Sequence, residues 1–352
     1  MNIAASAPGK LLLLGEYAVL EGAPALVLAV EVRARAHLSV TGTGDSWIEA
    51  PEVLSQRLHF TRDPEGSPRW PDADSRTRLA LVDQVLRGLA MRAQVPAGGL
   101  ALELDTAAFF VGGSGVRRKL GLGSSAALTV ALASALAAAA GAPLADRDAW
   151  LAQLLTLHRA FQGGRGSGAD LAAAVHGGCL VYRLTTGDRP QVAACAWPVN
   201  LPHLFVWSGR PASTGDFLAR LAAWREQQPR RYAAHFAELE TLAEAGAEAV
   251  ARGQNDALLA ACAEYAVALQ KLGDAAKIAI YSAAHCRIGA LVAAAGGVYK
   301  PCGAGGGDLG VALCADPERI VTIRRKLAQA GFACPQLTPA RQGLELQVFG
   351  AS

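Results

Sequence analysis

A glycine-rich segment that leads into an alanine-rich one, VRRKLGLGSSAALTVALASALAA, carries the clearest chemical signal in the chain. Gly121 and Gly123 allow the backbone to approach a bound group closely, and Ser124 and Ser125 stand where a helix is expected to begin. The free amide donors and the positive dipole end of a helix N-terminus bind phosphate. The basic run at 117–119 adds local positive charge. The segment therefore predicts a site for a polyanionic ligand or for a phosphoryl group in transfer.

Other interpretations of this segment have to be weighed against that one. Gly121, Gly123 and Ala126 fit the dinucleotide-binding pattern Gly-x-Gly-x-x-Ala, but that pattern should follow a buried strand, and here a basic run precedes it. A P-loop requires Gly-Lys-Ser or Gly-Lys-Thr, which the sequence lacks. An ordinary glycine turn with a serine at the helix start would bind nothing.

Two charged residues near other glycine-containing turns are candidates for the chemistry itself. Asp170, in QGGRGSGADLAAAV, could accept a proton from an acceptor group or orient its oxygen for attack on phosphorus. The structural alternative is an aspartate favoured by the dipole in the first turn of a helix. Lys10, in SAPGKLLLLGEYAVLEG, could hold a phosphate oxygen or keep Asp170 ionised, or it could simply flank a strand.

A third glycine cluster, in YKPCGAGGGDLGVAL, has five glycines within the eight residues 303–310. Such a density of glycine is costly in backbone entropy and contributes little packing. It favours close approach of the backbone to a ligand or to another loop over a plain turn.

Strands and helices are expected on both sides of these three segments. Apolar alternation, helix-start residues and turn residues locate them. We expect an alanine-rich helix that ends at Gly141, further helices at 76–93, 146–161, 216–272 and 317–330, a surface loop at 61–75, and strands at 11–14, 25–40, 100–106, 178–184, 201–209, 310–313 and 344–349. The composition changes after Pro190, which predicts two domains, 1–190 and 191–352.

The composition is that of a folded globular chain. Its 352 residues correspond to about two domains at ~150 residues each, and 52% are hydrophobic against 18% charged. A net charge of +3 is too small to indicate nucleic-acid binding. The seven cysteines form no Cys-x-x-Cys pair, so neither a zinc site nor a disulfide framework is expected. No basic stretch precedes the first apolar run, and the uncharged stretch 120–145 fits a buried helix, so we expect a cytoplasmic protein without nucleic-acid or membrane partners.

Taken in this order, APGKLLLLGEYAVL, GLGSSAA and GAGGGD resemble the three motifs of the GHMP small-molecule kinases, and the resemblance spans nearly the whole chain. It implies an α+β fold of two domains: an N-terminal α/β domain with a left-handed βαβ unit, a C-terminal ferredoxin-like domain, and a cleft between them for ATP and substrate. Gly15-Glu16-Tyr17, Lys119, GSGADLAAAVHGG and GRPASTGDF are most similar to the phosphomevalonate kinase subgroup. This implies ATP- and Mg²⁺-dependent conversion of (R)-5-phosphomevalonate to its 5-diphosphate, a step of isoprenoid synthesis, by a monomer or homodimer.

The resemblance also implies roles for individual residues. Lys10, Asp170 and Lys119 would be catalytic, and Ser124 or Ser125 would hold Mg²⁺. The ATP phosphates would be bound by Gly121, Leu122, Gly123, Ser124, Ser125 and Ala126. The substrate would be bound by Lys119, Ser167, Gly168, Ser213, Thr214, Gly305, Gly306 and Asp308.

The chain departs from the family pattern at several positions. Gly164-Arg165 stands without the usual valine, Ala169 replaces a phenylalanine, and Cys302 stands where serine is common. Where mevalonate kinases carry a magnesium-binding glutamate, the nearby candidates are His158 and Gln162. The alternatives to the implied reaction are mevalonate kinase or another GHMP kinase activity and, in a different class, a non-catalytic ligand sensor.

Overall fold

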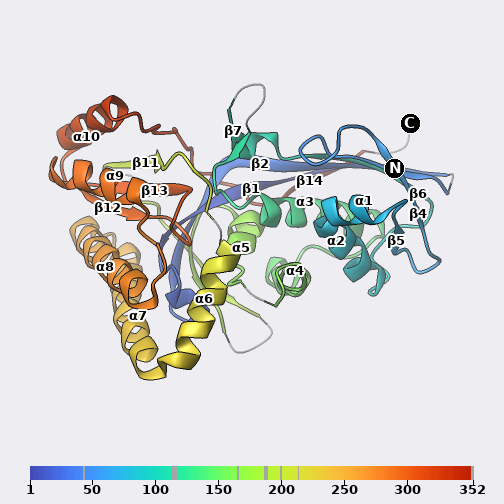
Figure 1. Ribbon diagram of the computed structural model, residues 1–352. Helices are drawn as coiled ribbons and strands as arrows, with labels where there is room; N and C mark the ends of the chain where they lie inside the picture. Colours follow the sequence, from blue (N-terminus) through green and yellow to red (C-terminus); the bar gives the residue numbers. More distant parts are fainter. Residues whose placement is uncertain are drawn as a thin grey trace.

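A large, mostly antiparallel sheet forms the centre of one half of the molecule (Figure 1). The computed structural model describes residues 1–42, 44–112, 117–164, 166–185, 189–198, 200–212 and 214–349. Within them the strand order is β10-β9-β2-β6-β3-β4-β5, with β1 pairing with both β2 and β14. β3 and β6 are parallel to each other. The strands of this sheet are β1 (Asn2–Leu14), β2 (Ala25–Thr41), β3 (Ser46–Glu49), β4 (Leu58–Arg62), β5 (Pro68–Arg69), β6 (Gly99–Asp105), β9 (Cys179–Arg183), β10 (Gln191–Cys195) and β14 (Glu345–Phe349).

The first strand is longer than its sequence suggests, because β1 begins at Asn2 and not at residue 11. Ile3, Ala5 and Ala7 alternate with less buried residues, but alanine is a weak strand former, so the alternation gives little signal. Pairing with β2 on one edge and β14 on the other stabilises this part of the strand. The pairing with β2 shifts register between Pro8 and Gly9, and such an irregularity re-aims the residue that follows, Lys10.

Helices cover one face of this sheet, below it in Figure 1. They are α1 (Ala73–Arg78), α2 (Ala80–Ala90), α3 (Ser124–Ala139), α4 (Arg147–Phe161) and α5 (Ala169–His176). The expected helix at 76–93 is divided at Leu79, whose backbone leaves the helical conformation, and the expected loop at 61–75 contains the end of β4, all of β5 and the start of α1. The alanine-rich helix α3 is buried on nearly all sides, as predicted. Among the described residues, no helix is both long enough and apolar enough to span a membrane.

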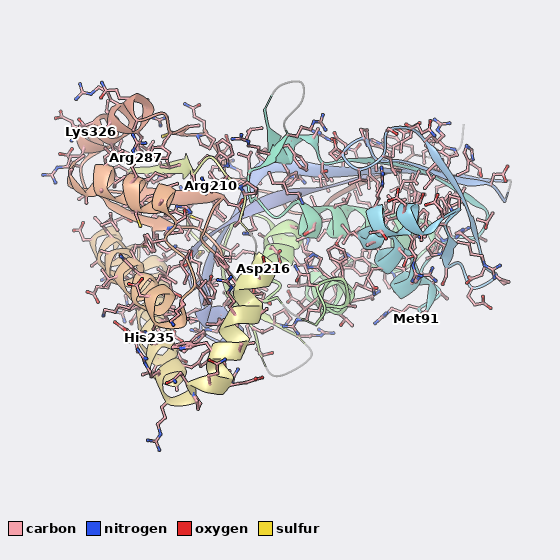
Figure 2. The ribbon with its side chains drawn as sticks, in the orientation of Figure 1. Met91, Arg210, Asp216, His235, Arg287 and Lys326 are labelled. Carbon is pink, nitrogen blue, oxygen red and sulfur yellow. The ribbon has the colours of Figure 1, made fainter. Side chains whose placement is uncertain are left out.

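The other half has a smaller sheet of order β11-β13-β12, on which α9 and α10 pack around Ile288, Val292 and Ile323. The long helices α7 and α8 pack against each other, and α8 also contacts β12. The chain passes from the large sheet to this half between β10 and β11, and after Arg210 it continues into α6, the helix that carries Asp216 (Figure 2). The elements of this half are β11 (His203–Trp207), α6 (Thr214–Gln227), α7 (Pro229–Ala251), α8 (Asn255–Ala276), α9 (Ala283–Ala293), β12 (Val298–Pro301), β13 (Leu309–Leu313) and α10 (Pro317–Gln329).

A shared hydrophobic core joins the two halves. Leu14 and Leu28 from the large sheet lie in one cluster with Leu239 of α7 and Tyr265 of α8. Two strands that follow residue 190, β10 and β14, belong to the large sheet. The mixed α+β fold is confirmed, and the division into domains at residue 190 stays a prediction.

Candidate active site

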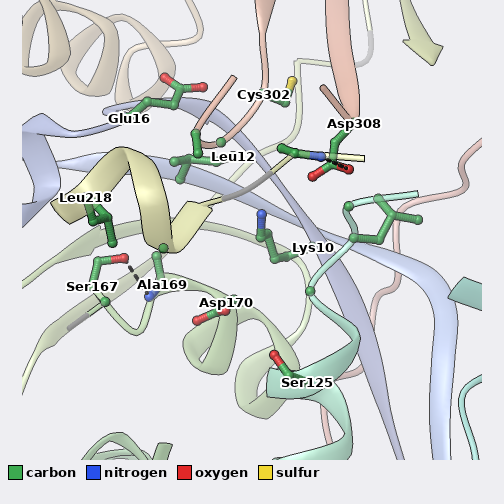
Figure 3. A pocket seen from close by; sticks show the side chains of 18 of the residues that line it. Lys10, Leu12, Glu16, Ser125, Ser167, Ala169, Asp170, Leu218, Cys302 and Asp308 are labelled. Carbon is green, nitrogen blue, oxygen red and sulfur yellow. Dashed lines mark hydrogen bonds between the residues drawn. The ribbon is translucent and has the colours of Figure 1, made fainter. Parts of the chain in front are cut away.

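The three glycine-containing segments meet at one cavity of about 660 Å³ between the two halves (Figure 3). Its walls come from β1, from the loop before α3, from the loop before α5, from the start of α6 and from the loop between β12 and β13. Of the predicted site residues, those that line the cavity are Lys10, Lys119, Gly121, Leu122, Gly123, Ser124, Ser125, Ser167, Asp170 and Asp308.

The loop before α3 has the geometry of an anion site. Gly121 and Gly123 have φ of +79° and +77°, a region that residues with a Cβ rarely adopt, and Gly123 is the N-cap of α3. Its backbone caps the helix without a side-chain hydrogen bond, so the first amides of α3 are available to a ligand. The strand before this loop is β8 (Arg118–Lys119), an exposed two-residue strand paired with β7 (Phe110–Val111). The dinucleotide-binding interpretation is therefore wrong, because no buried strand leads into the glycines.

Lys10 and Asp170 flank Gly123 from two sides. A Cβ added at Gly123 would lie 3.4 Å from Lys10 Cγ and 3.5 Å from Asp170 Cβ. The Lys10 amide donates a hydrogen bond of 2.9 Å to the Leu122 carbonyl, which fastens β1 to the phosphate-binding loop. Asp170 lies in the first turn of α5, near the positive end of that helix dipole. A cation, a carboxylate and a helix N-terminus therefore converge at one point of the cavity.

Asp308 joins the third glycine segment to the first two. Its Oδ1 accepts a hydrogen bond of 3.1 Å from the Ala212 amide, and its carboxyl carbon would lie 2.2 Å from a Cβ at Gly121. Burial raises the pKa of Asp308, while the Ala212 hydrogen bond and the charges of Lys10 and Lys119 act in the opposite direction. The absence of a side chain at Gly121 is thus required by packing as well as by φ.

Only one side chain of the basic run lines the cavity. Arg117 pairs with Glu52 at 3.2 Å, and Arg118 Nη1 donates a hydrogen bond of 3.1 Å to the Gly209 carbonyl. Lys119 lines the cavity on the side of Asp308. The run thus supplies one cation to a ligand, not three.

A buried ion pair at the wall of the cavity, where Glu16 is a lining residue, was not found from the sequence. Lys300 of β12 donates a hydrogen bond to Glu16 Oε1, and the two side chains are 0% and 1% exposed. Burial acts to lower the pKa of Lys300, but the adjacent Glu16 carboxylate raises it above its ordinary value. Tyr17 OH donates a hydrogen bond of 2.5 Å to the Ala304 carbonyl, next to this pair. The sequence gives one indication of this pair: Lys300 stands in the short apolar segment just before the third glycine cluster.

Comparison with known proteins identifies the family. The family described as "GHMP kinases N terminal domain" matches residues 82–178. Phosphomevalonate kinase of Streptomyces sp. (strain CL190) is 33% identical to this chain over 97% of the chain and 98% of the relative. This chain belongs to the GHMP kinase family. Among solved structures, Lin0012 from Listeria innocua has the same fold as this GHMP kinase, with a TM-score of 0.83 and 22% identity over 99% of each chain. Streptococcus pneumoniae phosphomevalonate kinase in complex with phosphomevalonate and AMPPNP also has this fold, with a TM-score of 0.74 and 20% identity over 96% of this chain and 99% of that one.

Several predicted residues of this GHMP kinase do not line the cavity. Ala126 and Gly168 are buried beneath it, at the starts of α3 and α5. Gly305 packs against Ile280, and Gly306 packs against Phe217. Ser213 lies outside the described residues, and Thr214 is described only as the first residue of α6. Gly303 and Ala304, within the segment 303–308 expected to line the cleft, do line the cavity. The contacts that sequence reasoning missed on this side are Cys302 from the third segment and Gly215 and Leu218 from α6.

Oxygen atoms suitable for Mg²⁺ are present at the phosphate-binding loop. The Ser124 and Ser125 hydroxyls and the Asp170 carboxylate line the cavity, and Mg²⁺ prefers oxygen ligands. The described residues contain no cluster of three or more His, Cys, Asp or Glu side chains able to hold a metal ion. His158 is buried with Nε2 3.4 Å from Ser125 Oγ, and an imidazole is a poor magnesium ligand. The donor set fits an ion that keeps several waters and binds substrate phosphates.

Proposed function

We propose that this GHMP kinase transfers the γ-phosphoryl group of ATP to the phosphate of (R)-5-phosphomevalonate, producing ADP and 5-diphosphomevalonate. One observation carries the proposal: Lys10, Lys119, Asp170 and the N-terminus of α3, from distant parts of the chain, line a single cavity. Two cations and a helix N-terminus suit a reaction in which donor and acceptor both carry phosphate. The full-length likeness to a phosphomevalonate kinase supports this choice of acceptor.

The residues divide between donor and acceptor. The backbone of Gly121, Leu122 and Gly123 and the first amides of α3, up to Ala126, hold the ATP phosphates. Lys119 and Ser167 bind the phosphate of the acceptor. Lys10, between these two groups, neutralises charge on the transferring phosphoryl group, where positioning and electrostatic stabilisation supply most of the catalysis. We assign Asp308, a lining residue, to the acceptor side of the cavity. Gly168, Gly305 and Gly306 are assigned to the packing behind that side. The assignment of Ser213 and Thr214 to the acceptor rests on the family resemblance.

Asp170 has a smaller proton-transfer task with this acceptor than it would have with an alcohol. The second pKa of a phosphate monoester is about 6, so the attacking oxygen is mostly deprotonated at neutral pH. The new bond joins this oxygen to the γ-phosphorus, and the bond from the γ-phosphorus to the bridging oxygen of ADP breaks. Asp170 accepts the proton from the minor monoanionic form, and Lys10 lies near it beside Gly123.

The hydroxyl of Ser124 or Ser125 would hold Mg²⁺. When bound, the ion neutralises charge on the ATP phosphates. The protein provides few ligands of its own, as expected for an ion held mostly by phosphates and water. We place the enzyme in the cytoplasm, as a monomer or homodimer acting on a small molecule.

Release of ADP with ATP and Mg²⁺ tests the proposal, with phosphomevalonate, mevalonate, galactose and homoserine as parallel acceptors. We expect turnover with phosphomevalonate alone. Preference for mevalonate would keep the kinase chemistry and overturn the acceptor. ATP binding without turnover on any of the four would favour the ligand-sensor alternative.

A further inference from the structure

The third glycine segment, 302–308, is held from behind by a buried histidine that lines no part of the cavity. His285 Nε2 lies 2.8 Å from the Gly307 carbonyl, and Nδ1 lies 2.7 Å from Tyr299 OH. The imidazole is 0% exposed. These two contacts join α9, β12 and the glycine segment in one chain of hydrogen bonds.

The partners fix the tautomer of His285. The Gly307 carbonyl can only accept a hydrogen bond, so Nε2 carries the proton and donates it. Nδ1 then accepts the hydrogen bond that Tyr299 OH donates. Burial lowers the pKa of His285, which keeps the ring neutral and this arrangement stable.

The helix that carries His285 is a rigid support. Ile288 and Val292 are fully buried against the small sheet, and they follow His285 at helical spacings of three and seven on the same face of α9. The Ser282 side chain caps the helix by accepting a hydrogen bond from the His285 amide. The donor at Nε2 is therefore held in place before any ligand binds.

Other hydrogen bonds also hold this segment: the Cys302 amide donates to the Leu309 carbonyl at 2.9 Å, and the Asp308 amide donates to the Arg210 carbonyl at 2.8 Å. Among the described residues, His285 supplies the hydrogen bond to the Gly307 carbonyl. The Gly306 amide donates to the Ile280 carbonyl at 2.7 Å, and the next residue after Gly307 is Asp308, which accepts from the Ala212 amide. On the other side of the segment, a Cβ at Gly303 would lie 3.8 Å from Lys10 Nζ. Gly303 and Asp308, on either side of Gly307 in the segment, line the cavity. A shift of the backbone at Gly307 would therefore move the cavity wall.

We propose that His285 is a positioning residue for the reaction, because its hydrogen bond to Gly307 pre-organises the third glycine segment around the acceptor. This inference rests on the proposed function for its kinetic consequence, but not for its structural one. Tyr299 orients the imidazole, and neither side chain touches a substrate.

Hydrogen exchange and kinetics on His285→Leu test the inference, with His285→Gln as the conservative variant because its amide can still donate to Gly307. In His285→Leu we expect deuterium uptake by the peptide spanning 302–308 to rise about tenfold, KM for phosphomevalonate to rise about tenfold, and kcat to fall by less than about threefold. His285→Gln should restore both values to within about threefold of the parent. Ile288→Val, which weakens packing on the same helix face, should leave both unchanged.

Unchanged uptake in a folded His285→Leu variant, or an equal change in Ile288→Val, would overturn the positioning role. If His285→Leu does not fold, Tyr299→Phe takes its place, and normal uptake at 302–308 in that variant overturns the proposal. The exchange measurement requires no acceptor. A parent enzyme that fails to use phosphomevalonate would therefore refute the proposed function without affecting this result.

Discussion

The ammonium group of Lys300 is buried against the carboxylate of Glu16, 284 residues away in the chain. Lys300 Nζ also donates a hydrogen bond of 2.9 Å to the Pro301 carbonyl, and Tyr265 OH donates one of 2.7 Å to the Glu16 carbonyl. These contacts tie the turn after β1 to the strand that leads into the third glycine segment. The pair thus fixes the distance between two walls of the cavity.

Removal of one partner should be far more damaging than removal of both. Lys300→Met leaves the Glu16 carboxylate buried without a counter-ion, and we expect the free energy of unfolding to fall by about 3–5 kcal/mol. The double variant Glu16→Gln/Lys300→Met should recover much of this loss. Lys271→Met, which removes an exposed pair with Glu238, should change the free energy of unfolding by less than about 1 kcal/mol. Urea denaturation measures all three, and equal losses in Lys300→Met and Lys271→Met would contradict the account.

Gly123→Ala should impair activity more than its backbone strain alone explains. The new Cβ would lie in van der Waals contact with Lys10 Cγ and Asp170 Cβ, at 3.4 Å and 3.5 Å, in addition to the strain at φ +77°. The methyl group would therefore restrict the movement of both side chains. Gly141 has the same φ of +77° with nothing within 4 Å of an added Cβ, so Gly141→Ala is a matched control for strain. Both variants should lose about 1 kcal/mol of stability. Only Gly123→Ala should lose kcat/KM for ATP, by about tenfold or more. Equal activity in the two variants would show that the added methyl group does not disturb Lys10 and Asp170.

Asp170→Ala should separate catalysis from nucleotide binding. We expect turnover to fall by about 10²–10⁴-fold, the range for a group that handles protons or orients reactants, while AMPPNP binding stays within about threefold of the parent. Asp256→Ala removes an aspartate from the first turn of α8, outside the cavity, and should leave turnover unchanged. Binding is measured by calorimetry and turnover by ADP release. Full turnover in Asp170→Ala would remove Asp170 from the mechanism.

The basic run offers a direct comparison of two neighbouring cations. Lys119→Ala should raise KM for phosphomevalonate by about tenfold or more, because a charge-assisted contact to phosphate is lost. Arg117→Ala should change KM by less than about threefold, because that guanidinium pairs with Glu52 outside the cavity. Similar values for the two variants would mean that the run acts by its total charge and not through Lys119.

Asp308 and Asp72 should make opposite contributions to the pH dependence of stability, because the pKa of Asp308 is raised and that of Asp72 is lowered. Burial raises the pKa of Asp308, so its contribution to stability is present at low pH and is lost as the pH rises through the native pKa. Asp308→Asn should therefore gain melting temperature relative to the parent between roughly pH 3 and pH 7. Hydrogen bonds from the Ser75 amide and hydroxyl lower the pKa of Asp72, so Asp72→Asn should lose melting temperature relative to the parent over the same range. Parallel trends in the two variants would contradict the pKa directions.

The sequence by itself determined the kinds of chemistry and most of the elements. Glycines before two serines at a helix start, an aspartate in another first turn and a lysine beside an apolar strand are local patterns. Local backbone preferences suffice to predict a phosphate site from them. In the α3 loop, Gly121 and Gly123 have the positive φ that this pattern predicts, and the phosphate site itself stays a prediction. Strand β1 was underestimated because alanine contributes little to a strand signal, although it packs well once neighbours are present.

Only the tertiary structure decided which of these residues face one another. Charge alone does not distinguish the three cations at 117–119, and only the family resemblance singled out Lys119. In the structure, Arg117 pairs with Glu52 and Arg118 binds the Gly209 carbonyl, and Lys119 lines the cavity. Gly303, Gly305 and Gly306 belong to the same glycine cluster of the sequence. In the structure Gly303 lines the cavity, whereas Gly305 packs on Ile280 and Gly306 packs on Phe217. The Glu16–Lys300 pair joins the two halves, and the His285–Gly307 contact joins α9 to the third glycine segment within one of them. Such contacts depend on long-range packing, and no local preference of the chain encodes them.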